Sequence, residues 1–108
     1  ILGGSASVPH GYTSCVMLPY VLAYNRDVNA TRQDEVAEAM GHPGERASDV
    51  LDAFIAGLGM PRSLTDVGVS AERIPELARN CMLDDWTFSN PKPIRSPEQV
   101  EEILHSAL

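Results

Sequence analysis

The sequence has few basic residues and no basic cluster. Eight Lys and Arg side chains stand against 15 Asp and Glu, which gives a formal net charge of −7 at pH 7. Because a nucleic-acid-binding protein needs positive surface to neutralise phosphates, we expect no nucleic-acid partner. The longest near-continuous apolar run, Cys15 to Tyr24, covers ten residues, whereas a membrane span needs roughly 20. We therefore also expect no membrane partner.

Cysteine is scarce, and the first residues of the sequence do not resemble a targeting leader. Cys15 and Cys81 share no C-x-x-C spacing, and a domain of this size needs no disulfide, so free thiols and a cytoplasmic location are expected. The chain opens on Ile1-Leu2-Gly3-Gly4 without an initiator Met. We expect it to be part of a longer protein.

Apolar residues recur at helical spacing, and no segment alternates with the period of a strand. Residues 10–25 predict a buried central helix kinked at Pro19, and residues 31–40 a short amphipathic helix. The clearest helical stripe lies in residues 47–58. It consists of Ala47, Val50, Leu51, Phe54, Ile55 and Leu58.

Two further helices are marked by their first residues. Ser70 is predicted as an N-cap, with Val69 placed to pack on Ile74. Ser96-Pro97-Glu98-Gln99 is a complete helix start, with a capping Ser, a Pro at the first position and a Gln three residues after the cap. The predicted buried stripes are Ile74, Leu77, Ala78 and Cys81, and Val100, Ile103, Leu104 and Ala107.

The remaining segments predict loops. Residues 1–9 are Gly/Ser-rich, so we expect a loop that adds little to the core, with Gly3-Gly4 ending a preceding helix. Residues 60–68 predict a turn-rich connector, and residues 83–95 an irregular crossing that presents Trp86 and Phe88. The sequence therefore predicts an all-α fold, with about five helices in one domain.

His10 is the side chain best placed for chemistry. It begins the apolar helix, where the positive end of the helix dipole disfavours an imidazolium and leaves a neutral ring that can bind a metal. The alternative is a histidine with a structural role, because a metal centre needs several ligands and the sequence clusters none around it. His42 and His105 are expected at the surface.

Trp86, the one tryptophan of the chain, allows two interpretations. As a core anchor it would pack between the last helix and the helix of His10. Otherwise it is the wall of a ligand pocket. The residue pattern leaves both open.

A series of motifs resembles, in order and spacing, the iron-containing (group III) alcohol dehydrogenases. The motifs are Leu2-Gly3-Gly4, Pro9-His10-Gly11, Leu18-Pro19-Tyr20-Val21, Tyr24-Asn25, Leu58-Gly59-Met60-Pro61, Leu64-Thr65-Asp66-Val67-Gly68-Val69 and Asn90-Pro91-Lys92-Pro93. The resemblance implies the C-terminal part of that family's helical metal-binding domain, which is dehydroquinate synthase-like. The dinucleotide-binding domain and the other metal ligands would lie upstream of Leu2.

For function, the resemblance implies hydride transfer between NAD(P) and a small alcohol, aldehyde or ketone, with a divalent metal, Fe²⁺ or Zn²⁺. Of the family's Asp and His ligands only the last maps here, onto His10. Trp86 and Phe88 lie in the loop that folds back over the metal in the family, which makes them candidates for the substrate pocket. The 108 residues alone are expected to be inactive and to bind neither the metal nor NAD(P) fully.

Two alternatives remain. Residues 9–14 and 90–94 also resemble the maleylacetate reductase branch, which reduces an enoate, although Gly11 and Tyr12 differ from the Ala and Glu frequent there. From a different class, the chain could be a non-catalytic helical interaction module. A piece cut from a larger protein would expose apolar residues, and we expect a patch around Val8, Tyr12 and Val16 that drives homo-oligomerisation.

Overall fold

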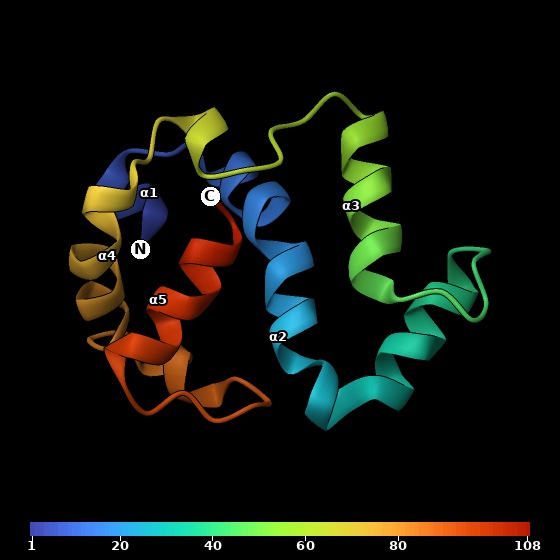
Figure 1. The fold of residues 1–108 in the computed structure, drawn as a ribbon. Coiled ribbons are helices and arrows are strands. Elements are labelled where there is room, and N and C mark those ends of the chain that lie inside the picture. Colours follow the sequence, from blue (N-terminus) through green and yellow to red (C-terminus); the bar gives the residue numbers. More distant parts are fainter.

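The computed structural model describes all 108 residues and contains only helices and connecting turns (Figure 1). The predicted all-α class, with five α-helices, is confirmed. None of the helices combines the length and apolar content that a membrane crossing requires. The α-helices are α1 (Leu2–Ala6), α2 (His10–Ala39), α3 (Ala47–Gly57), α4 (Ile74–Cys81) and α5 (Pro97–Ser106), and the short 3-10 turns are η1 (Thr65–Val67), η2 (Ala71–Arg73) and η3 (Asp85–Ser89).

One apolar core holds α2, α4 and α5 together. In Figure 1, α5 lies between α4 and the first half of α2, and it packs on both. The core includes completely buried side chains from α2, from the segment before η1 and from α4, namely Val16, Leu64, Ile74 and Leu77. These contacts join segments that are far apart in the sequence.

The helices α4 and α5 follow the sequence pattern closely. Gln99 completes the predicted capping box of α5, its Oε1 accepting a hydrogen bond from the Ser96 N–H at 3.2 Å. After Ser70 the chain first makes the turn η2, so α4 itself begins at Ile74. Of the two predicted stripes only Cys81 is partly exposed, and Ile74, Leu77, Ala78, Val100, Ile103, Leu104 and Ala107 are buried.

The N-terminal segment contains the helix α1, so the prediction of a loop over residues 1–9 is wrong. Gly3 and Gly4 lie inside α1, and the helix ends at Ser7, whose φ of 57° is left-handed. Leu2 and Val8 are buried in the main core. Their burial stabilises a segment whose paired glycines have low helix propensity.

The helix α2 spans His10–Ala39 and bends sharply at Asn29, which lies in the gap between the two helices predicted for residues 10–25 and 31–40. The break lies at Asn29, with φ −137° and ψ 31°, and not at the buried Pro19. Gln33 spans it, because its buried Nε2 donates to the Leu22 carbonyl oxygen at 2.7 Å and to Asn29 Oδ1 at 2.8 Å. An amide side chain therefore satisfies polar groups at the bend.

The helix α3 shares only a small second core with α2. That core consists of Ala37, Ala47 and Val50. Phe54 and Leu58, which belong to the predicted stripe, are 55% and 62% exposed. The stripe of α3 is therefore only half covered in this chain.

The prediction of an exposed apolar patch near the start of α2 is also wrong. Val8 and Val16 are buried, and of the three predicted residues only Tyr12 is exposed. In contrast, Leu18, on the helix predicted to be buried, is exposed. The first half of α2 therefore packs on the core along one face only.

Two leucine truncations test where the core lies. We expect Leu77→Ala to lower the free energy of unfolding by about 2–5 kcal/mol, because it leaves a cavity in the main core. Leu58→Ala is the matched control and should cost less than about 0.5 kcal/mol, because its side chain is mostly in solvent. Urea unfolding followed by circular dichroism measures both. Equal losses would contradict the assignment of the core to α2, α4 and α5.

Candidate functional site

His10 stands at the first turn of α2, exposed to solvent. Pro9 precedes the helix, and no side chain caps this end. The His10 carbonyl oxygen accepts a hydrogen bond from Thr13 Oγ1 at 2.7 Å, while the imidazole is left accessible. The ring nitrogens are therefore available for a ligand.

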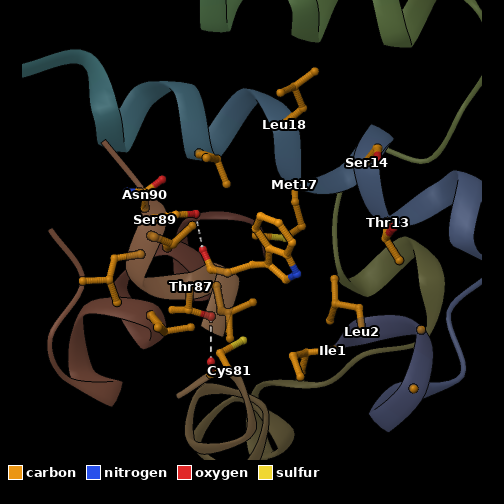
Figure 2. Close-up of a pocket in the computed structure, with 18 of the residues that line it drawn as sticks. Ile1, Leu2, Thr13, Ser14, Met17, Leu18, Cys81, Thr87, Ser89 and Asn90 are labelled. Atoms are coloured by element: carbon orange, nitrogen blue, oxygen red, sulfur yellow. Dashed lines mark hydrogen bonds between the residues drawn. The ribbon is translucent and has the colours of Figure 1, made fainter. Parts of the chain in front are cut away.

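A hollow of about 780 Å³ begins beside His10 and extends along the inner face of α2. Its walls come from α1, α2, the end of α4, η3 and α5. In Figure 2 the side chains of Leu2, Met17 and Cys81, from three different helices, point into it. Because Val100, Ile103 and Leu104 of α5 also line it, its floor is part of the main core.

One face of α2 lines the hollow at regular helical spacing from His10. The face continues through Thr13 and Ser14 to Met17 and Val21. Steps of three and four residues place these side chains above one another on a helix. Only His10 of this face was predicted as a site residue, although the helical spacing of the others is present in the sequence. The residues of α1 and α5 that line the hollow are brought there by the tertiary structure, so no local sequence pattern identifies them as lining residues.

The two aromatic residues of η3 do not share one environment. Trp86 lines the hollow and is 82% exposed, so it is not the core anchor considered from the sequence. Phe88 is 54% exposed and does not line the hollow. The structure thus brings His10 and Trp86 to one hollow and leaves Phe88 outside its wall.

The hollow is apolar, with few ionisable groups. No Asp, Glu, Lys or Arg lines it, and more than half of the lining residues are hydrophobic. Its two ionisable side chains are His10 and Cys81. Burial raises the pKa of the Cys81 thiol above its ordinary value, which keeps this sulfur neutral and weakly nucleophilic near pH 7.

The residues of this chain do not form a complete metal site. No three His, Cys, Asp or Glu side chains lie close enough together to hold an ion. His10 alone is a suitable donor, because it is accessible and lies beside a hollow without competing charges. It fits a metal site only as one ligand among others that this chain does not contain.

Comparison with known proteins identifies the family. The model of the Fe-containing alcohol dehydrogenase family, C-terminal, matches residues 1–108. The chain belongs to this family. It is 32% identical to the lactaldehyde reductase of Escherichia coli strain K12 over 98% of its own length and 30% of that protein.

Solved structures of the family share the fold. The alcohol dehydrogenase from Oenococcus oeni matches with a TM-score of 0.87 and 29% identity, over 99% of this chain and 30% of that one. The maleylacetate reductase from Rhizobium sp. strain MTP-10005 matches with a TM-score of 0.83 and 31% identity, over 99% and 29%. The chain therefore spans about a third of the length of the family members it matches.

The alkylation rate of Cys81 tests the environment at the end of α4. We expect the pH midpoint of its reaction with iodoacetamide to lie above that of the same cysteine in urea-unfolded protein, because burial disfavours the thiolate. Peptide-resolved mass spectrometry follows Cys81 separately from Cys15. A folded-state midpoint equal to the unfolded one would show that Cys81 is not held in the apolar wall.

Proposed function

We propose that this chain is the helical part of a metal-dependent, NAD(P)-linked alcohol dehydrogenase or carbonyl reductase. The observation that carries the proposal is that His10, to which the family resemblance assigns the last metal ligand, is exposed and lines the apolar hollow of about 780 Å³. The substrate class is a small alcohol, aldehyde or ketone. We place the protein in the cytoplasm, and we expect a homo-oligomer formed through exposed apolar surface.

In this proposal, His10 supplies one ligand to a divalent ion, Fe²⁺ or Zn²⁺. Such an ion, when bound, would stabilise negative charge on the substrate oxygen as a Lewis acid, and NAD(P) would exchange the hydride. The remaining ligands and the dinucleotide site would come from residues outside this chain. The 108 residues alone are therefore expected to be inactive.

The hollow would hold the carbon skeleton of the substrate. Its walls carry no Asp, Glu, Lys or Arg side chain, so they suit a small and weakly polar molecule. Met17 and Leu104 exclude water from the space beside the reacting carbon. Trp86 closes one side, where an indole restricts the size of the molecule that fits.

A maleylacetate reductase-type reaction, the reduction of an enoate, is the second candidate. It is favoured by the 35% identity to the maleylacetate reductase of Rhizobium sp. over 99% of this chain. Maleylacetate is a dicarboxylate, whereas no Lys or Arg of this chain lines the hollow. The observed wall therefore favours the alcohol dehydrogenase, and parallel assays with lactaldehyde and maleylacetate would decide between them.

Replacing His10 tests its proposed role as a ligand. In the whole protein that contains this chain, we expect His10→Ala to weaken metal binding by about 100-fold or more, because one ligand of the site is lost. The measured quantity is the metal content per protein after dialysis, determined by inductively coupled plasma mass spectrometry. His105→Ala, which removes an exposed imidazole outside the hollow, should leave the metal content unchanged. Full metal content in His10→Ala would overturn the assignment.

Replacing Trp86 tests the proposed wall of the pocket. Because the side chain is largely in solvent, Trp86→Ala should change the free energy of unfolding by less than about 1 kcal/mol. We expect the range of accepted alcohols to extend to bulkier molecules, as shown by kcat/KM over a series of chain lengths. Phe88→Ala is the comparison variant on the same turn and should leave the range unchanged. A large loss of stability with an unchanged range would contradict the assignment.

A further inference from the structure

Two asparagines join α2 to the segment between α4 and α5. Asn25 Nδ2 donates to Asn90 Oδ1 at 2.9 Å, and Asn90 Nδ2 donates to Asn25 Oδ1 at 2.6 Å. The backbone of Lys92 adds two bonds, since its N–H donates to Asn25 Oδ1 at 3.2 Å and its carbonyl oxygen accepts from Asn90 Nδ2 at 2.8 Å. Asn25 is only 4% exposed. Water therefore competes little for these hydrogen bonds, which strengthens them.

The side chain of Lys92 adds a weaker attachment at the same place. Its Nζ lies 3.2 Å from Asp27 Oδ2 and 4.5 Å from the centre of the Tyr24 ring. Asp27 is exposed, so this ion pair holds less firmly than the buried amides. Both attachments join residues 24–27 of α2 to residues 90–92.

The asparagine pair lies next to the turn that carries Trp86. The Asn90 N–H donates to the Thr87 carbonyl oxygen at 3.4 Å, and Ser89 Oγ donates to the Trp86 carbonyl oxygen at 2.7 Å. In the middle of η3, Thr87 Oγ1 donates to the Cys81 carbonyl oxygen at 2.6 Å, which ties the turn to α4 (Figure 2). The turn is thus attached to α4 through Thr87 and, through the following residue Asn90, to α2 by the amide pair.

The hollow lies between these two attachments. Met17 lines it from α2, and Trp86, Ser89 and Asn90 line it from the opposite segment. Asn25 is on α2 but is not among the lining residues. A change at Asn25 therefore acts on the hollow only through its partner Asn90 and the turn that Asn90 follows.

We propose that Asn25 is a positioning residue that sets the distance between Trp86 and α2, and thereby which substrates the hollow admits. The statement about substrates rests on the proposed function. The statement about the position of Trp86 does not, because it concerns only the contacts of this chain.

Asn25→Leu and Gln33→Leu form a matched pair of variants. Both residues are buried amides on α2 with side-chain hydrogen bonds, so both variants are destabilising. Only Asn25 contacts the segment of Trp86, because the bonds of Gln33 stay within α2. In the whole protein labelled with fluorotryptophan, the ¹⁹F resonance of Trp86 is assigned by its absence in Trp86→Phe. We expect Asn25→Leu to shift that resonance and Gln33→Leu to leave it in place.

Specificity provides the second readout. We expect Asn25→Leu to change the ratio of kcat/KM for 1-propanol and benzyl alcohol by about tenfold, within the range that pocket shape supplies. Loss of folded enzyme lowers both values equally, so it leaves this ratio unchanged, as expected for Gln33→Leu. An unchanged ¹⁹F resonance and an unchanged ratio in folded Asn25→Leu would overturn the proposal, as would equal changes in both variants.

The outcomes separate this proposal from the proposed function. If the wild-type protein oxidises neither alcohol, the proposed function fails, and the ¹⁹F resonance still decides whether Asn25 positions Trp86. If Asn25→Leu does not fold, Lys92→Met replaces it, because it removes the ammonium from Asp27 and Tyr24 and keeps the stem. We expect Lys92→Met to shift the ¹⁹F resonance of Trp86 relative to the wild type, and no shift would then overturn the proposal.

Discussion

The packing of α5 between α4 and α2 is the constraint on which the rest of the structure depends. The apolar face of α5 is buried against both neighbours, and the same face forms the floor of the hollow. The floor is therefore as rigid as the core, because close-packed side chains resist displacement. The walls near η3 depend instead on a few hydrogen bonds. A change of specificity is easier to obtain at these walls than at the floor.

The elements that could be predicted from the sequence are those whose signal is local. The capping box at Ser96 and the stripe around Leu77 need no knowledge of distant residues, and both are confirmed. The segment α1 was missed because Leu2 and Val8 gain their burial from helices far along the chain. An interruption between residues 25 and 31 was predicted and lies at Asn29, but the Gln33 hydrogen bonds that bridge it were not predicted. Periodicity also identified a stripe on α3, but it cannot show whether a partner covers it.

Only part of the candidate site could be predicted from the sequence, because the site also depends on contacts between distant segments. His10 emerged from its position at a helix start and from the family motif, and it does lie beside the hollow. Trp86 could be named but not placed, since the residue pattern allowed a buried or an exposed indole. Phe88 was selected because it is close to Trp86 in sequence, although the two occupy different surroundings. Asn25 stood out only as part of the family motif Tyr24-Asn25, and its role was not predicted, because its partner Asn90 is 65 residues away in the sequence.

We propose that His10, beside the apolar hollow, is one ligand of a metal ion in the whole protein. Anomalous X-ray diffraction from crystals of that protein, recorded at the iron and zinc absorption edges, locates the ion. We expect an anomalous peak about 2.0–2.1 Å from a ring nitrogen of His10, which is the typical length of a zinc–imidazole bond. An occupied metal site whose peak lies beyond the reach of His10 would contradict this proposal.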